Sequence, residues 1–539
     1  MRAIALLLTA IFLALTAQPA LAAEPERVTR AEATGAADRD PKVREQEREH
    51  GELASVATLD EDDDKWEVAY FDAGDQLALV VVDAGSGEVE ESWTGYQVSW
   101  KMARGYSGAF GHKLNAPYVF LPLCLIFLVG LVDWRRPRRV ANLDLLVLLG
   151  FGVSHYFFNR GDIGVSVPLV YPVLIYLLGR CLWIGLRGRG EGLRPVWSVT
   201  VLIVAALFLM GFRVGLNVAD SGAIDVGYAG VVGADRIAHT EQLYDNFPDD
   251  VSSGDTYGPV NYLAYLPFEL IWPYSGEWDD LPAAHAASII FDIAVFTFLI
   301  LLGMRIRPGP EGQRLAAILA FGWAAYPYTA YVLESNSNDS LVAALLLATL
   351  LFAAKPLRRG ALLAAATWTK FVAAPLAPMY LTYRSGPTVL FTLGFILVSA
   401  VVLLWPAIDP GLKTFYDRTI ASQAGRDSPF SIWGQTSLEP IRVGLLVALG
   451  ALSITFAFAP RQKSLVQLAA LSAALLILLQ LTLHHWFYLY VVWFYPLLLI
   501  ALAASPVRTS RPDLARSPQP PPPSPKRHPP PSRTGLASG

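Results

Sequence analysis

The sequence predicts an all-α polytopic membrane protein with a small α+β domain in its N-terminal part. Hydrophobic residues make up 53% of the 539 residues and charged residues only 16%, whereas soluble domains have about 25% charged residues. Eleven apolar segments are long enough to cross a bilayer, and a stretch of alternating polar and apolar residues precedes them. This composition excludes an ordinary soluble enzyme. The formal net charge of −4 gives no reason to expect a nucleic-acid partner.

The N-terminal end has the pattern of a secretory signal peptide. Met1-Arg2 is followed by an apolar stretch from Ile4 to Thr16 and by the small-residue cleavage site Ala20-Leu21-Ala22. We therefore expect residues 1–22 to be a signal peptide and residues 23–115 to form an extracytoplasmic domain. A retained first membrane helix is the alternative, although the apolar core is shorter than the roughly 20 residues that a span needs.

Residues 23–115 contain 21 acidic and 10 basic side chains, and their pattern changes near Lys65. The part before Lys65 is charged and predicts helix. Alternation predicts strands over residues 66–71, 76–82 and 88–90. A turn is expected at Asp83–Gly87. Over some sixty residues this pattern resembles the PepSY family of small exported α+β modules, with segment 82–89 as the best match, and the resemblance implies a binding or regulatory role.

The membrane part is predicted to contain eleven transmembrane helices and one half-length helical hairpin. The spans are expected at residues 116–134, 141–158, 165–186, 196–216, 283–304, 315–333, 340–355, 387–405, 440–458, 464–482 and 487–505. Segment 360–383 is also apolar, but Lys370 and two prolines interrupt it, which favours two half-length helices that enter from one face. We expect residues 116–195 to be accessory helices and residues 196–505 to be the membrane core.

Basic residues predict the orientation of the spans, because they collect on the cytoplasmic side. The basic clusters lie at residues 135–139, 187–194, 305–314, 355–359, 384, 461–463 and in the tail from Arg508. All of them are inside if residue 115 is outside, and a cleaved signal peptide requires the same starting side. The proline-rich residues 506–539 are then a disordered cytoplasmic tail. The expected location is a bacterial plasma membrane, with the N-terminal domain and the active site extracytoplasmic.

The longest predicted outer loop, residues 217–282, contains twelve acidic residues and one basic residue, Arg236. The orientation rule alone accounts for much of this acidity, because acidic loops are tolerated outside. Within the loop, Tyr257–Trp272 is apolar and aromatic while both of its ends are outside. This segment therefore predicts an interfacial helix and not a span.

Two aspartates follow the span that ends near Leu216, and each is a candidate catalytic base. A carboxylate at this depth can take a proton from a hydroxyl while a lipid substrate stays in the membrane. Asp225 and Asp220 are therefore alternative catalytic residues. Asp255 and Tyr257 open the interfacial helix, which is expected to pack over such a site.

Polar residues in the membrane segments mark a second part of the candidate site. Lys370 lies at the tip of the broken hairpin, and a cation there is costly unless it binds an anion such as a phosphate. Snorkelling to the surface without a ligand is the alternative. Segment 334–339 joins two spans with almost no loop, so we expect Asn336, Asn338 and Asp339 to bind substrate.

His484 and His485 lie at the predicted outer end of another span. In a helix, adjacent rings point about 100° apart, which is poor geometry for a shared metal ion. We therefore expect one of them to hydrogen bond or to contact a phosphate, and we expect no metal. The two cysteines, Cys124 and Cys181, lie within apolar segments and predict neither a disulfide framework nor a metal site.

Several of these segments, in this order, resemble the GT-C superfamily of polyprenyl-phosphate-sugar-dependent glycosyltransferases. The closest resemblance is to glycosyltransferase family 87, which includes polyprenol-phosphate-mannose-dependent mannosyltransferases, and it covers about residues 196–505. The matching segments are Asp225–Tyr228, Leu243–Asp245, Thr256–Pro259, Asn336–Asp339, Thr369–Lys370 and Arg426–Ser431. The resemblance implies an inverting transfer of a sugar from a lipid-linked monophosphosugar, with a loop aspartate as general base and usually without a required metal.

The resemblance also implies roles for individual residues. Asp225 would deprotonate the acceptor hydroxyl. Lys370, with Arg426 or His485, would hold the donor phosphate, and Tyr257 with neighbouring aromatic residues would line the sugar pocket. Tyr228 and Asp255 are further expected substrate-binding residues. The implied partners are a polyprenyl-phosphate sugar, a glycan or glycolipid acceptor and the lipid bilayer, and no cofactor is expected beyond the donor substrate.

The sequence departs from the family pattern at specific places. Asp225 has the family spacing to Tyr228, whereas Asp220 lies nearer to the membrane, and we favour Asp225 as the base. Gly258 stands where two consecutive prolines are common. The three spans before residue 196 and the exported domain do not belong to the family core.

Two other classes of protein fit part of the pattern. A transporter or flippase for a lipid-linked or amphiphilic solute also has broken helices and intramembrane charges. Such a protein normally has an internal repeat, and we find no convincing one. A membrane sensor is less consistent with the sequence, because the tail after Ser505 is short and proline-rich.

Overall fold

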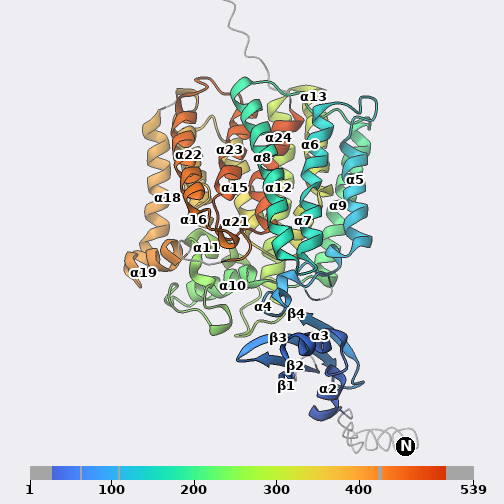
Figure 1. Ribbon diagram of the computed structural model, residues 1–539. Coiled ribbons are helices and arrows are strands. Elements are labelled where there is room, and N and C mark those ends of the chain that lie inside the picture. Colours follow the sequence, from blue (N-terminus) through green and yellow to red (C-terminus); the bar gives the residue numbers. More distant parts are fainter. Residues whose placement is uncertain are drawn as a thin grey trace, which may run out of the picture. The chain divides into compact units, whose positions relative to one another are not determined.

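The computed structural model describes residues 27–504, except 61–63, 107, 109, 386 and 423–427 (Figure 1). The predicted signal peptide, the proline-rich tail and Arg426 lie outside the described residues. The described chain contains a small α+β part and a bundle of apolar helices. This arrangement agrees with the predicted combination of a membrane bundle and an N-terminal α+β domain.

The N-terminal part contains two helices and an antiparallel sheet with the strand order β1-β2-β3-β4. Its elements are α2 (Arg30–Ala37), α3 (Pro41–His50), β1 (Ala54–Asp60), β2 (Lys65–Asp72), β3 (Asp75–Asp83) and β4 (Val89–Thr94). Val68, Val80 and Val82 of the sheet are buried in one cluster with Ala33 and Val43 of the helices. The alternation in β2 and β3 thus places one face of the sheet against the helices.

The first strand begins earlier in the chain than predicted. β1 lies within the part that was expected to be helical, and it pairs with β2 so that Ala57 is opposite Val68. Ala57 is the buried side chain of this edge strand, so the alternation that predicts strands is weak there. The predicted turn is present: Asp83 Oδ1 accepts hydrogen bonds from the Ser86 N–H and hydroxyl, each at 2.6 Å. These hydrogen bonds lower the pKa of Asp83.

Six helices of the described chain are long and apolar enough to cross a membrane. They are residues 140–158, which comprise α6 (Val140–Leu149) and α7 (Phe151–Phe158), and α8 (Ile163–Arg187), α9 (Val199–Asp220), α12 (Pro282–Ile306), α18 (Thr388–Ile408) and α22 (Glu439–Phe458). A seventh candidate is the pair α13 (Gly309–Ala325) and α14 (Pro327–Glu334), which is bent by 56°. The bend lies at Pro327, which disfavours helical geometry at the residue before it.

Four of the predicted spans are shorter apolar helices in the structure. They are α5 (Pro117–Leu131), α15 (Asp339–Leu351), α23 (Leu465–Gln480) and α24 (Val491–Ala503). Most side chains of α23 and α24 are buried by neighbouring helices. α23 and α24 therefore form part of the core of the bundle, where hydropathy alone does not separate a short span from a buried helix.

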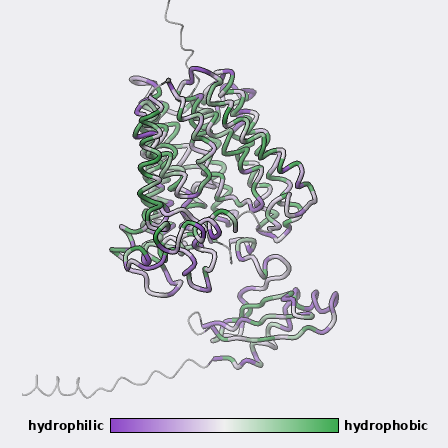
Figure 2. The backbone as a smooth tube through the Cα atoms, turned by 90° about the vertical axis from the view of Figure 1, so that its left-hand side faces the viewer, coloured by the Kyte–Doolittle hydropathy of each residue, from purple (hydrophilic) through white to green (hydrophobic). Residues whose placement is uncertain are grey.

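The surface of the bundle is apolar. Figure 2 shows hydrophobic residues concentrated along its helices. On α18, Val389, Val401 and Ile408 have exposed fractions of 74%, 65% and 76%. Helices with large exposed apolar side chains and internally satisfied backbone groups are suited to a lipid environment. The chain is therefore a membrane protein.

Two helices of the long loop lie together at one end of the bundle (Figure 1). α10 (Asp225–Ala238) packs against α11 (Pro259–Glu269), which occupies the segment predicted as an interfacial helix. Gly230 and Gly233 of α10 face Tyr265 and Tyr262 of α11, and a Cβ atom at either glycine would lie 2.7 or 2.1 Å from the facing ring, too close for a side chain. These contacts hold the loop as a folded layer.

The apolar stretch 360–383 is interrupted at the predicted residue. α16 (Pro356–Lys370) ends at Lys370, and Phe371 then adopts a left-handed conformation with φ of +56°. The short helices η5 (Ala374–Leu376) and α17 (Ala377–Leu381) follow. The break places Lys370 at a helix C-terminus, where the helix dipole favours a cation.

Candidate functional site

Four separate segments of the chain enclose a cavity of about 340 Å³. Its lining residues are Thr256, Tyr257, Lys370, Phe371, Val372, Thr419, Ile420, Leu479, Leu483, His484, His485, Tyr490 and Trp493. The structure thus brings together Tyr257, Lys370, His484 and His485, all of which the sequence predicts to bind substrate. The remaining walls are mostly apolar or aromatic, which is the usual composition of a ligand pocket.

Lys370 is the central cation of this cavity. Its side chain is 9% exposed, and its ammonium group pairs with the carboxylate of Asp339. The ammonium nitrogen also lies 5.4, 5.7 and 5.3 Å from the ring centroids of Tyr257, Tyr490 and Trp493. Such aromatic neighbours stabilise a desolvated cation. An ammonium group has three N–H donors, so the pair with Asp339 leaves donors for a ligand.

Asp339 is fully buried and holds Lys370 from the side of α15. Besides the ammonium group, it accepts hydrogen bonds from Trp493 Nε1 at 2.6 Å and from the Ser337 hydroxyl at 2.8 Å. These donors satisfy the oxygens of a carboxylate that is removed from water. Asp339 therefore fixes Lys370 and does not line the cavity itself.

The other polar residues of segment 334–339 form a buried network. Asn336 donates a hydrogen bond to Ser221 Oγ at 2.9 Å and accepts one from Asn217 Nδ2 at 2.8 Å. Asn338 donates to Asn261 Oδ1 at 2.7 Å. These contacts join α9, α11 and α15. Neither Asn336 nor Asn338 lines the cavity, so the structure gives the two residues a role in joining these helices.

Tyr257 reaches Lys370 because a glycine follows it. The Gly258 N–H donates to the Thr369 carbonyl at 3.1 Å, and a Cβ atom at Gly258 would lie 2.0 Å from the Trp368 carbonyl oxygen. No residue with a side chain fits this close approach of two backbones. The glycine that departs from the family pattern is therefore the residue that places Tyr257 beside α16.

Asp225 lies at the first turn of α10 and is exposed. Gly227, two residues later, packs on the Asn336 carbonyl, where a Cβ atom would lie 2.3 Å from the oxygen. Burial raises the pKa of Tyr257 well above its ordinary value, and the negative charges of Asp225 and Asp339 raise it further. Asp225 does not line the cavity itself, and its carboxylate adds to the negative charge around Tyr257, which does.

Asp220 has a different environment from Asp225. Its carboxylate forms an ion pair with Lys113 Nζ at 2.8 Å and accepts the Lys113 N–H at 3.4 Å. Lys113 belongs to η2 (His112–Asn115), which precedes the first apolar helix. Asp220 thus links α9 to this segment.

Tyr228 is part of an aromatic cluster in the long loop. Its hydroxyl is 2.6 Å from the Tyr274 hydroxyl and 3.2 Å from an oxygen of Asp250, and its ring stacks on Trp278 at 4.7 Å. Burial raises the pKa of Tyr228. Tyr228 does not line the cavity, so the structure places it away from the other predicted substrate-binding residues.

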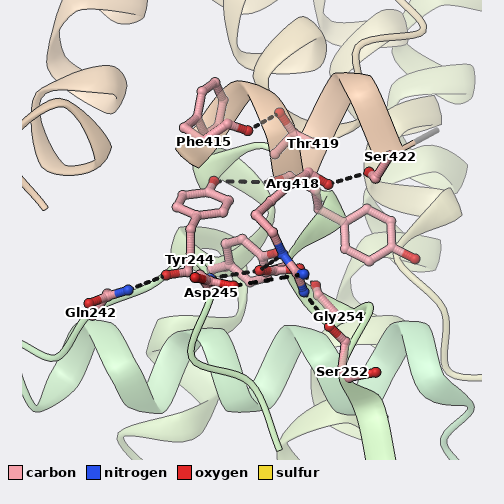
Figure 3. A network of polar contacts seen from close by, with 12 residues as sticks. Gln242, Tyr244, Asp245, Ser252, Gly254, Phe415, Arg418, Thr419 and Ser422 are labelled. Carbon is pink, nitrogen blue, oxygen red and sulfur yellow. Dashed lines mark hydrogen bonds and ion pairs between the residues drawn. The ribbon is translucent and has the colours of Figure 1, made fainter. Parts of the chain in front are cut away.

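Asp255 forms an ion pair with a residue that sequence reasoning missed. The carboxylate is fully buried, and Arg418 donates to it from Nε at 2.6 Å and from a terminal nitrogen at 2.8 Å. The Asp245 N–H donates to the same carboxylate at 2.7 Å, and Arg418 also reaches the Ser252 carbonyl (Figure 3). The hydrogen bonds that Arg418 donates to Asp255 raise the pKa of Arg418.

This ion pair supports two walls of the cavity. Asp255 belongs to η4 (Gly254–Thr256) and is two residues before Tyr257. Arg418 belongs to the π-helical turn η7 (Asp417–Ala421) and is the residue before Thr419. Both Tyr257 and Thr419 line the cavity. The sequence contained no local signal for this pair, because Arg418 and Asp255 are 163 residues apart.

We expect Arg418→Met to destabilise the protein by about 2–3 kcal/mol, because it leaves the buried Asp255 carboxylate without its cation. Arg418 is 35% exposed, so the loss should be smaller than for a fully buried pair. Denaturation of the purified protein in mixed micelles measures the effect. Lys413→Met is the matched control, because the pair of Lys413 with Asp417 is exposed and its removal should cause no measurable change. Equal stabilities of the two variants would contradict a structural role of Arg418.

The two histidines have different contacts. His485 Nδ1 lies 2.9 Å from the Ser428 hydroxyl, and its ring lies edge-on to Phe430. His484 Nε2 lies 3.9 Å from Glu439. Ser428 and Phe430 belong to the segment that contains Arg426, which itself lies outside the described residues. Within the described ranges, no three His, Cys, Asp or Glu side chains are grouped to hold a metal ion.

Comparisons with known proteins do not extend this description. No family model matches the chain, and no curated protein is similar enough to match it. The resemblance to GT-C glycosyltransferases therefore remains a prediction from short segments. Any proposal about function rests on this resemblance and on the geometry of the site.

Proposed function

We propose that this protein is a membrane glycosyltransferase of the GT-C type, close to glycosyltransferase family 87. It transfers a sugar, with mannose as the first candidate, from a polyprenyl-phosphate donor to a glycan or glycolipid acceptor. The observation that carries the proposal is the cavity in which Lys370, Tyr257, His484 and His485 meet from distant parts of the chain. Apolar walls and a buried cation are what a lipid-linked phosphate requires, and the proposed general base, Asp225, lies at the start of α10 outside the cavity lining.

In the proposed reaction, the acceptor oxygen attacks the anomeric carbon of the donor sugar, and the bond from that carbon to the lipid phosphate breaks. Asp225 takes the proton of the acceptor hydroxyl as general base. Polyprenyl phosphate leaves as a stable anion, so Lys370 can stabilise the developing charge without donating a proton. A single displacement inverts the anomeric centre, in contrast to a double displacement through a covalent intermediate.

The proposal includes a topology. We infer that the eleven apolar helices are eleven spans and that the broken segment 360–383 is a hairpin. The N-terminal domain and the cavity are then extracytoplasmic in a bacterial plasma membrane, with the C-terminus in the cytoplasm. This orientation is supported by the basic clusters at one set of span ends. The α+β part, which resembles PepSY, is proposed to bind or regulate.

The decisive experiment is sugar transfer from a labelled polyprenyl-phosphate donor in membranes that contain the protein. We expect a labelled glycan or glycolipid product that depends on the donor and is absent from membranes with the empty vector. Release of unlabelled polyprenyl phosphate should accompany it. Consumption of the donor that is equal in both membranes, over a panel of acceptors, would contradict the proposal.

A transporter of a lipid-linked or amphiphilic solute is the second candidate function. The observation that favours it is a buried ion pair within the bundle, in which Arg213 lies 2.8 Å from Asp292, and Trp323 Nε1 donates to the same oxygen at 2.9 Å. Intramembrane charges commonly mark transport pathways. In sealed vesicles, movement of an intact labelled lipid-linked sugar between leaflets would identify this function.

A further inference from the structure

A second cavity, of about 700 Å³, lies between α5 and α7. Phe120, Leu121 and Cys124 of α5 and Gly152 and Val153 of α7 form its apolar part. Leu121 and Val153 are 62% and 57% exposed on the outside of the bundle. The cavity therefore opens toward the surface that lipid covers. It shares no lining residue with the cavity around Lys370.

The end of this cavity near the C-terminus of α7 is polar. His155, Asn159 and Arg160 line it there. His155 is 3% exposed, and within the described chain its Nε2 atom has no hydrogen-bond partner. The same is true of the buried Oδ1 atom of Asn159. A buried polar atom without a partner costs free energy, so a ligand that satisfies both atoms would gain affinity from them.

The unpartnered atoms define the chemistry that this end can bind. A side-chain amide oxygen accepts hydrogen bonds only, and a neutral imidazole nitrogen either donates or accepts. A hydroxyl group can satisfy both atoms, because it donates and accepts. The His155 ring is held in place by stacking on Tyr488 at 4.3 Å, and the Tyr488 hydroxyl lies 2.6 Å from that of Ser154.

Arg160 adds a positive charge at the rim. Its guanidinium donates to the Tyr156 hydroxyl at 3.2 Å and forms an exposed ion pair with Asp162 at 3.7 Å. Arg104 also lines the cavity but donates to the carbonyls of Gln97 and Val98, and the described lining residues include no carboxylate. A guanidinium has five N–H donors, so Arg160 keeps donors that suit a phosphate group. The rim therefore favours an anion next to the groups that require a hydroxyl.

We propose that this cavity binds one membrane phospholipid whose anionic head group carries hydroxyl groups. An acyl chain lies along the apolar part between α5 and α7. The phosphate contacts Arg160, and head-group hydroxyls satisfy His155 Nε2 and Asn159 Oδ1. This site is distinct from the proposed donor cavity, and its occupancy does not depend on sugar transfer.

Native mass spectrometry of the purified full-length protein tests the proposal with three probe lipids. Phosphatidylglycerol carries a charge and hydroxyls, phosphatidylmethanol carries the same phosphodiester charge without hydroxyls, and phosphatidylcholine has neither a net charge nor hydroxyls. We expect phosphatidylglycerol to bind about tenfold more tightly than phosphatidylcholine, with phosphatidylmethanol between them. Equal binding of phosphatidylglycerol and phosphatidylcholine would overturn the proposal. Equal binding of the two anionic lipids would overturn the role of the hydroxyls.

Variants locate the binding in this cavity. Val153→Trp should fill the cavity and abolish preferential retention of phosphatidylglycerol. Val204→Trp is the matched control, because Val204 is 61% exposed on α9 and does not line the cavity. Arg160→Gln should reduce the preference for phosphatidylglycerol about tenfold while the exposed position leaves folding intact. Equal lipid retention by both tryptophan variants would show nonspecific annular lipid and contradict the site.

Discussion

Asp225→Asn is expected to lower the rate of sugar transfer by about 10²–10⁴-fold, the usual contribution of a general base. Asparagine has nearly the same shape as aspartate but cannot accept a proton from the acceptor hydroxyl. Asp225 is exposed in the first turn of α10, so its replacement should cost at most about 1 kcal/mol of stability through the helix dipole. The measurement is the initial rate of product formation in membranes with matched amounts of protein, under saturating donor.

Asp220→Asn is the matched control for this experiment. The two aspartates are five residues apart, but Asp220 pairs with Lys113 whereas Asp225 begins α10 and adds to the negative charge around Tyr257. We expect Asp220→Asn to retain most of the activity. A loss with Asp220→Asn and full activity with Asp225→Asn would reverse the assignment. Full activity of both variants would remove both aspartates from the mechanism.

The class of fold was predictable because its signals are strong and local. Long apolar segments and alternating strands are both periodic patterns within short windows of sequence. The break at Lys370 was also predictable, because a cation and two prolines interrupt an apolar stretch. The strand β1 was not predictable from the sequence, because it buries only one side chain and its sequence is similar to that of a polar linker.

The candidate site was predictable in its residue types but not in its assembly. Lys370 and His485 were identified by charge and polarity at the ends of spans, and the structure brings both to one cavity. Arg418 was missed because its partner, Asp255, is 163 residues away in sequence. Asn336 and Asn338 were predicted to bind substrate, but neither lines the cavity. Buried amides that support a site have the same sequence signature as amides that bind a ligand.

Lys370→Met is expected to abolish sugar transfer and to destabilise the protein by about 3–5 kcal/mol, because it leaves the buried Asp339 carboxylate uncompensated. This single variant does not separate a role in binding the donor from a role in folding. Asp339→Asn has the same ambiguity, since it leaves a cation without its anion in an apolar environment.

The double variant Lys370→Met/Asp339→Asn separates the two roles. It removes both charges of the pair, and replacement of a buried ion pair by neutral residues is often close to neutral for stability. Asparagine also keeps an oxygen that can accept the hydrogen bond from Trp493 Nε1. We therefore expect the double variant to recover most of the stability lost in each single variant, as measured by denaturation in mixed micelles.

The activity of the double variant then decides the role of Lys370. If the ammonium group binds the donor phosphate, the variant stays inactive although it is folded, and the apparent affinity for the polyprenyl-phosphate donor falls. If Lys370 only neutralises Asp339, activity returns together with stability. The first result is the one we expect, because the structure places Lys370 at the cavity and Asp339 behind it. A recovered activity would leave the phosphate to the histidines that line the same cavity.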